Sequence, residues 1–135
     1  MSNPAAKMSN PAAFAQNLPK AIIIDKAVII DDEMDICLLL GMALKKLGIS
    51  SLRAQTLSDG LEKATNDQPT IIFLDNNLPD GQGIDQIAQF RKNVPLAKLI
   101  MITAMGGLRE RALALGADGF VEKPLDLRKI EAVLR

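Results

Sequence analysis

The chain has 135 residues, a length suited to one domain with a packed core. Lysine plus arginine and aspartate plus glutamate both number 16, so the formal net charge is zero, and no basic block indicates a nucleic-acid-binding face. Histidine is absent and Cys37 is the single cysteine, which excludes a disulfide within the chain, a Cys/His zinc site and a histidine-based catalytic triad. Chemistry must therefore rest on carboxylates, hydroxyls and lysines.

The first 25 residues differ in composition from the rest of the chain. Residues 1–20 are rich in Ala, Pro, Asn and Ser, and the hexapeptide Met-Ser-Asn-Pro-Ala-Ala occurs twice. This composition predicts a disordered leader before a domain over residues 21–135, because it buries too little apolar surface to offset the ordering entropy. The segment from Ala21 to Asp25 leaves three interpretations open: it prolongs the first strand, pairs with a sheet edge, or covers apolar surface on another subunit. No 18 apolar residues run uninterrupted, so we expect no membrane span and a cytoplasmic protein.

From residue 27 onward, apolar runs alternate with helical patterns, and Thr56 and Asp126 are candidate N-caps. The run at 70–75 ends on Asp75 and is typical of a strand buried on both faces. Five strands alternating with five helices predict a doubly wound α/β fold, with a five-stranded parallel sheet of flavodoxin-like order 2-1-3-4-5. We expect strands at 28–30, 49–54, 70–75, 98–102 and 119–122, and helices at 34–47, 57–66, 84–92, 108–116 and 127–134.

In this strand order the carboxyl ends of neighbouring strands carry Asp31, Asp32 and Asp75, with Thr103 and Lys123 closing the same edge. Carboxylates this close repel, and at an effective dielectric near 20 each pair at about 4 Å costs on the order of 4 kcal/mol. A bound Mg²⁺ would relieve the repulsion and leave positions for phosphate oxygens. A carboxylate can also act as a nucleophile toward phosphorus, with transfer assisted by positioning and charge neutralisation.

Residues 26–135 resemble the receiver domain of two-component response regulators. Five separate motifs match in order and spacing, which makes the resemblance specific. They are Asp31-Asp32-Glu33, Asp75 followed by Leu78-Pro79-Asp80-Gly81 and Gly83, Thr103-Ala104, Gly116-Ala117 with Phe120, and Lys123-Pro124.

The resemblance implies a phosphoacceptor role for Asp75, with a histidine kinase or a histidine phosphotransfer protein as the donor. It implies that Asp32 and Asp75 bind Mg²⁺ through their side chains, Asn77 through its backbone carbonyl, and Asp31 through water. A receiver of this kind is a signalling domain and not an enzyme, beyond its own phosphotransfer and dephosphorylation. It switches contacts with a downstream protein target, as a monomer or as a phosphorylation-dependent dimer.

The resemblance also implies that Thr103 hydrogen-bonds a phosphoryl oxygen, that Lys123 pairs with its charge, and that Phe120 is an aromatic switch. Two features depart from the family. The segment between Thr103 and Lys123 is shorter than usual around residues 105–107, beside the expected output face, and Phe120 replaces the commoner tyrosine. We expect Asn77 and the methionine at position 105 to flank the phosphoryl site and to control water access to it.

The first predicted helix is apolar nearly all round. Ile36, Leu39, Leu40 and Ala43 form a stripe by spacing, and in the family the matching face receives the helices of the kinase. The alternative is that the leader or the last helix covers this face, which the sequence leaves open. Cys37 is expected to fill the core.

Two other functions share parts of the pattern. A phosphatase of the haloacid dehalogenase type also uses an aspartate after a strand, but it needs a second acid two residues on, where Asn77 stands. A flavodoxin-like FMN binder needs a phosphate-binding loop where residues 31–33 are acidic. We therefore expect a single-domain receiver of the chemotaxis or relay type, or the receiver segment of a larger transcription regulator or hybrid kinase.

Overall fold

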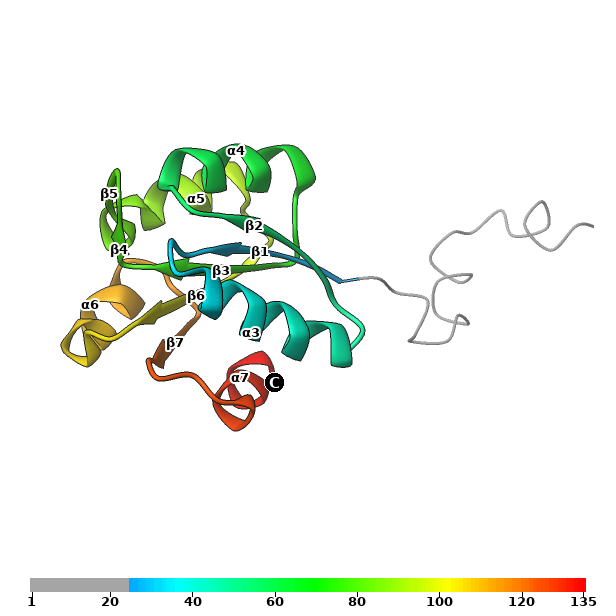
Figure 1. Cartoon of the computed structure of the whole chain (residues 1–135). Coiled ribbons are helices and arrows are strands. Elements are labelled where there is room, and N and C mark those ends of the chain that lie inside the picture. Colours follow the sequence, from blue (N-terminus) through cyan, green and yellow to red (C-terminus); the bar gives the residue numbers. More distant parts are fainter. Residues whose placement is uncertain (1–24) are drawn as a thin grey trace, which may run out of the picture.

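The computed structural model describes residues 25–135, so the predicted leader at 1–20 and the interpretations of residues 21–24 lie outside the described part. The described residues contain a five-stranded parallel sheet of order β2-β1-β3-β6-β7, which confirms the predicted topology. Figure 1 shows helices above and below this sheet. The strands are β1 Lys26–Ile30, β2 Ser50–Ala54, β3 Ile71–Asp75, β6 Lys98–Thr103 and β7 Gly119–Glu122.

The five predicted helices are present, but the third and the fourth begin with a turn of 3-10 helix, at Gly83–Gln86 and Gly106–Leu108. The fourth helix is also shorter than predicted. A small antiparallel hairpin after the central strand was not predicted; it consists of β4 Asn77–Leu78 and β5 Gly81–Gln82. The α-helices are α3 Met34–Lys46, α4 Leu57–Asp67, α5 Ile87–Asn93, α6 Arg109–Ala114 and α7 Leu127–Leu134.

The sheet separates two apolar cores. Along β1, Ala27 and Ile29 pack with α3 and α7, whereas Val28 and Ile30 pack with α4, α5 and α6. Successive side chains of a strand point to opposite faces, so a strand covered on both sides must be apolar throughout. This explains the continuous apolar runs of β1 and β3, and it leaves the strand ends as the place where polar groups gather.

Side-chain caps fix the starts of two helices, as predicted. Thr56 accepts a hydrogen bond from the backbone N–H of Asp59 at 3.1 Å at the start of α4. Asp126 accepts one from the N–H of Lys129 at 2.8 Å at the start of α7. Each cap satisfies an N–H group that has no partner within its helix. None of the helices in residues 25–135 is long and apolar enough to cross a membrane.

Helix α3 corrects one part of the predicted docking stripe. Leu40 is completely buried, so its place on a partner-binding surface was wrongly predicted. Ala43 is also buried, although it lines a small cavity between α3 and α7, and Ile36 is half-buried. Leu39 is 40% exposed and is the one clear surface member of the four. Because α3 is apolar nearly all round, spacing alone did not show which stripe faces the sheet.

Candidate functional site: an acidic pocket at the carboxyl edge of the sheet

Three carboxylates converge where β1 and β3 end. The pairing of Ile30 with Leu74 places the next residues, Asp31 and Asp75, side by side. Both are buried, at 0% and 3% exposure, whereas Asp32 is exposed. One oxygen of each of the three carboxylates lies within 4.8 Å of the others, close enough to hold one metal ion together. The structure thus brings together the three acids that the strand order had predicted to meet.

Lys123 lies over the same acids from the end of β7. Its Nζ is 2.9 Å from Asp31 Oδ2 and 3.5 Å from Asp75 Oδ2. A third carboxylate, that of Glu33, is closest at 2.6 Å. The N–H of Lys123 donates to the carbonyl of Thr103 at 2.9 Å, which ties β7 to the end of β6. The sequence placed Glu33 in a motif but gave no sign that it would pair with the lysine.

The donor set of the pocket fits a hard cation. Asp31 Oδ1 accepts a hydrogen bond from the N–H of Glu33 at 2.8 Å. Asp31 Oδ2 is buried, and its close polar neighbour among the described residues is the ammonium group of Lys123 at 2.9 Å. Together with the neighbouring oxygens of Asp32 and Asp75 it forms an all-oxygen donor set, and oxygen atoms are the ligands that Mg²⁺ prefers.

Burial and mutual repulsion change the acidity of these groups. Burial, together with the charge of Asp31, raises the pKa of Asp75 from 3.8 to about 6, although Lys123 acts in the opposite direction. Burial also raises the pKa of Asp31, against the effect of its contacts with Lys123 and Glu33. For Lys123, burial alone lowers the pKa, but contacts with Glu33, Asp31 and Asp75 raise it overall. The pocket therefore carries more negative charge than one lysine neutralises.

The backbone after Asp75 is fixed by hydrogen bonds within the loop. The N–H of Asn76 donates to Asp75 Oδ1 at 2.8 Å. Asn76 in turn accepts from the N–H of Gly83 with its carbonyl, at 2.8 Å, and from the N–H of Ile84 with its side chain, at 3.1 Å. A Cβ on Gly83 would lie 2.2 Å from the carbonyl oxygen of Asp75, so only glycine permits this close approach.

The β4–β5 hairpin continues from this loop toward α4. Asp80 at its tip accepts hydrogen bonds from the N–H groups of Leu57 and Ser58, at 2.8 and 3.0 Å. These bonds lower the pKa of Asp80. An acid in a Pro-Asp-Gly sequence indicates only a turn, so sequence reasoning did not single out Asp80 as a site residue. Asn77, the predicted backbone ligand, lies in β4 opposite Gln82.

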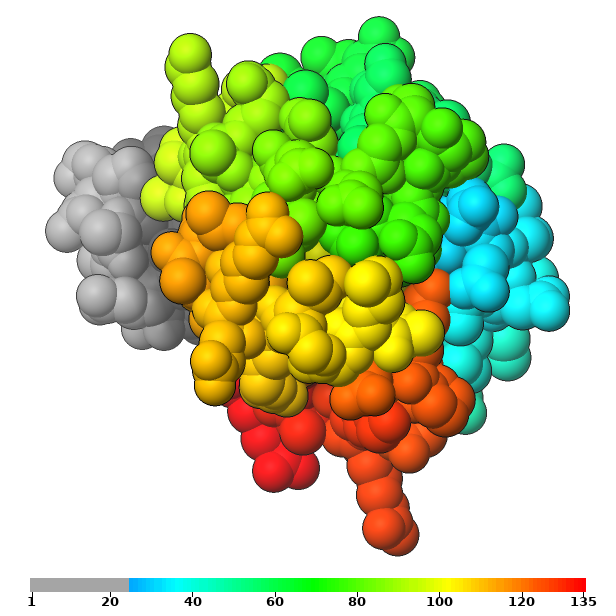
Figure 2. Space-filling model, turned by 90° about the vertical axis from the view of Figure 1, so that its left-hand side faces the viewer, coloured from blue at the N-terminus to red at the C-terminus, as the bar shows by residue number. Residues whose placement is uncertain are grey.

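Thr103 and Met105 border the pocket on the side of β6. Thr103 is completely buried, and its hydroxyl accepts a hydrogen bond from the N–H of Met105 at 3.1 Å. The sulfur of Met105 lies 3.8 Å from the side-chain nitrogens of both Asn76 and Asn77. Figure 2 views the molecule from this side, where the yellow loop after β6 borders the green loop after β3.

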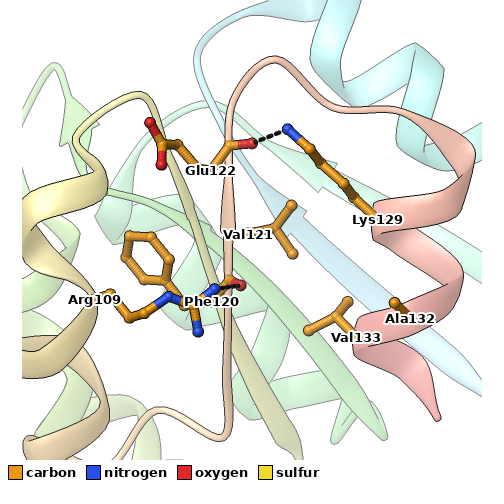
Figure 3. Close-up of a pocket in the computed structure, with 7 residues that line it drawn as sticks. All are labelled: Arg109, Phe120, Val121, Glu122, Lys129, Ala132 and Val133. Atoms are coloured by element: carbon orange, nitrogen blue, oxygen red, sulfur yellow. Dashed lines mark hydrogen bonds between the residues drawn. The ribbon is translucent and has the colours of Figure 1, made fainter.

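Phe120 lies beneath the surface between α6 and the sheet. It is 5% exposed and packs in the core on the α4–α6 side. The guanidinium group of Arg109 lies 5.3 Å from the centre of its ring and donates to its backbone carbonyl at 3.4 Å. Beside them is an open cavity of about 410 Å³ formed by α6, β7 and α7 (Figure 3). The ring of Phe120 is therefore part of the apolar core.

The sequence profile of the response regulator receiver domain matches residues 27–135. The chain therefore belongs to this family of signalling domains, and the family resemblance is confirmed. It is 32% identical over 111 residues to the response regulator protein PilR of Pseudomonas aeruginosa, and the match covers 81% of this chain and 25% of PilR. It is 36% identical over 112 residues to the KDP operon transcriptional regulatory protein KdpE of Escherichia coli, and that match covers 80% of this chain and 48% of KdpE. The chain thus spans half or less of these two relatives.

Solved structures support the same fold. A CheY-like response regulator receiver domain from Methanospirillum hungatei is 28% identical with a TM-score of 0.76, and the match covers 83% of this chain and 91% of that one. A response regulator from Burkholderia pseudomallei, solved with a phosphorylated aspartic acid, a calcium ion and citrate, is 24% identical with a TM-score of 0.76. That match covers 82% of this chain and 66% of the other, and it shows the shared fold.

Proposed function

We propose that this protein receives a phosphoryl group on Asp75 from a histidine kinase or a histidine phosphotransfer protein, in a Mg²⁺-dependent reaction. The observation that carries the proposal is the buried carboxylate of Asp75, with the ammonium group of Lys123 on one side and two further carboxylates within reach of a shared metal ion. Membership of the receiver family supports the same assignment.

The proposed ligands of Mg²⁺ are the side chains of Asp32 and Asp75 and the backbone carbonyl of Asn77, with Asp31 acting through water. The three carboxylates, whose oxygens lie within 4.8 Å of one another, support this assignment. When bound, the metal would neutralise the excess charge of the pocket and bind an oxygen of the transferred phosphoryl group.

The residues of the chain supply the remaining chemistry. A carboxylate oxygen of Asp75 attacks phosphorus, the bond from phosphorus to the donor histidine breaks, and an aspartyl phosphate forms. Lys123 then pairs with the phosphoryl charge, since its Nζ already lies 3.5 Å from Asp75 Oδ2. Attack needs the ionised carboxylate, and the pKa of about 6 keeps Asp75 largely ionised at neutral pH even before a cation binds.

Thr103 and Phe120 are proposed to report the phosphorylated state. The hydroxyl of Thr103 would turn toward a phosphoryl oxygen and reorganise its contact with the N–H of Met105. That rearrangement would change the packing around Phe120 and the surface formed by α6, β7 and α7, where a downstream protein would bind. The protein would act through such contacts and not as an enzyme.

The phosphodonor is proposed to dock on the exposed part of α3. Leu39 and Met42 are 40% and 64% exposed, and together with Ala43 and Leu127 they line a small cavity between α3 and α7. A helix of a kinase or phosphotransfer protein could lay apolar side chains against this surface, which lies on the helix that begins beside the acidic pocket. Met42 was not part of the stripe predicted from spacing.

Incubation with Mg²⁺ and acetyl phosphate tests the proposal. We expect intact-mass spectrometry to show one added phosphate in the wild-type protein and none in Asp75→Asn. Asp85→Asn is the matched control, because Asp85 pairs with Arg111 on the surface and should leave phosphorylation unchanged. Absence of a mass change in the wild type contradicts the proposal, and rapid turnover of a phosphate ester would instead favour a phosphatase.

A further inference from the structure

The hairpin that follows the phosphoacceptor strand is attached to the start of α4. Both carboxylate oxygens of Asp80 are used, one by the N–H of Leu57 and one by the N–H of Ser58. Helix α4 has its own cap in Thr56, which serves the N–H of Asp59. The first turn of α4 is therefore capped twice, once by the residue before the helix and once by a residue 23 positions away in sequence.

Apolar contacts reinforce this attachment. Leu78 of the hairpin and Leu57 of α4 are buried in the same core. Gly81 follows Asp80 with a φ of +149°, and a Cβ there would lie 3.2 Å from Leu57 Cδ1. The hairpin thus lies closely against α4 at its tip, while hydrogen bonds from Gly83 and Ile84 to Asn76 hold its base.

We propose that Asp80 is a positioning residue for the metal site: by holding the hairpin against α4, it fixes the backbone carbonyl of Asn77 at the pocket. This inference rests on the proposed function, in which that carbonyl is a Mg²⁺ ligand. Asn77 and Asp80 are both exposed, so burial of their side chains does not hold them in place. A carboxylate bonded to two N–H groups at a helix N-terminus is a strong anchor, since the helix dipole favours its charge.

The contacts of Asp80 predict a selective defect. Asp75 is positioned by Asn76 and by the close approach of Gly83, and neither contact involves Asp80. Loss of Asp80 should therefore weaken metal binding while the fold of the phosphoacceptor strand is retained. By thermodynamic linkage, Mg²⁺ should also strengthen the contact between the hairpin and α4 and slow hydrogen exchange at Leu57 and Ser58.

Calorimetric titration with Mg²⁺ alone tests this inference on the full chain. For Asp80→Ala we expect roughly tenfold weaker binding, as when an outer partner of a metal ligand is removed. Asp80→Asn, which keeps one acceptor oxygen, should lie between this variant and the wild type. Thr56→Ala is the matched control because it removes a cap from the same helix end without touching the hairpin, and its Kd should stay within about twofold of the wild type.

Wild-type affinity in Asp80→Ala, or an equal loss in Thr56→Ala, overturns the inference and leaves the proposed function standing. If Asp80→Ala does not fold, Asp80→Asn decides by the same comparison. Amide exchange gives a second measurement: Mg²⁺ should slow exchange at Leu57 and Ser58 in the wild type, and unchanged exchange counts against the coupling. A wild-type protein that neither binds Mg²⁺ nor accepts phosphate overturns the proposed function and this inference together.

Discussion

Lys123 forms its closest ion pair with Glu33 and not with the phosphoacceptor. Its Nζ lies 2.6 Å from Glu33 Oε2 and 3.5 Å from Asp75 Oδ2. The side chain of Glu33 is 58% exposed and that of Lys123 only 12%, so the pair joins the rim of the pocket to its interior. Solvent weakens such a pair, but the geometry still draws the ammonium group away from Asp75.

The first prediction is that Glu33→Gln accelerates phosphorylation. Without the rim carboxylate, Lys123 can approach Asp75 and the incoming phosphoryl group more closely. An exposed ion pair contributes up to about 1 kcal/mol, so the rate should rise by no more than about fivefold. The initial rate with acetyl phosphate at saturating Mg²⁺ measures the effect, and Glu62→Gln on exposed α4 surface is the control. A slower rate in Glu33→Gln would show that Glu33 assists the lysine.

The second prediction concerns stability and pH. The pKa of Asp75 is raised in the folded protein to about 6, so the folded state favours the protonated form. The stabilisation that protonated Asp75 gives the fold is fully present below about pH 4, which is near the pKa of this group in the unfolded chain. It is lost as the pH rises through the folded pKa of about 6. Without Mg²⁺, Asp75→Asn should therefore be more stable than the wild type at pH 8, by at most about 3 kcal/mol.

Urea unfolding at pH 4 and pH 8, with and without Mg²⁺, measures this difference in the free energy of unfolding. The difference should be small at pH 4, where Asp75 is largely protonated in the folded protein and partly protonated in the unfolded chain. Added Mg²⁺ at pH 8 should reduce the advantage of the variant because it stabilises the wild-type carboxylates. A variant that is less stable than the wild type at pH 8 without metal would show that Asp75 is stabilising when ionised.

The sequence predicted the acidic pocket because parallel strands place their carboxyl ends at one edge, whatever the details of packing. Asp31, Asp75 and Lys123 each directly follow or end a strand, so the strand order alone brought them together. The contacts of Asp80 and the burial of Leu40 depend on structural details that the strand order does not determine. Asp80 reaches α4 only through the register of a hairpin two residues long on each side, and Leu40 faces the sheet through a helix rotation that an all-round apolar pattern does not specify.

The third prediction separates docking from folding on α3 with two neighbouring residues. Leu39→Glu places a charge on a side chain that is 40% exposed, so the melting temperature should change little while phosphotransfer from a histidine kinase falls. Leu40→Ala removes a completely buried side chain and should cost about 2 to 5 kcal/mol of folding stability. Phosphorylation by acetyl phosphate should be unchanged in Leu39→Glu, since that donor needs no docking surface. Equal losses with both donors would place the defect in the pocket.

The last prediction is that Met105 protects the aspartyl phosphate from water. Its side chain is 45% exposed and its sulfur lies against the amide nitrogens of Asn76 and Asn77, so it covers the rim of the pocket from the loop after β6. Met105→Ala should open this rim and speed loss of phosphate by about threefold, a change in barrier below ~1 kcal/mol. The decay of the phosphorylated mass after removal of acetyl phosphate measures the rate.

Leu115→Ala is the control, since Leu115 is 46% exposed after the end of α6 and should leave the decay unchanged. Equal decay in wild type and Met105→Ala would mean that water reaches the phosphoryl group by another route, leaving the contact between Met105 and the two asparagines a structural one.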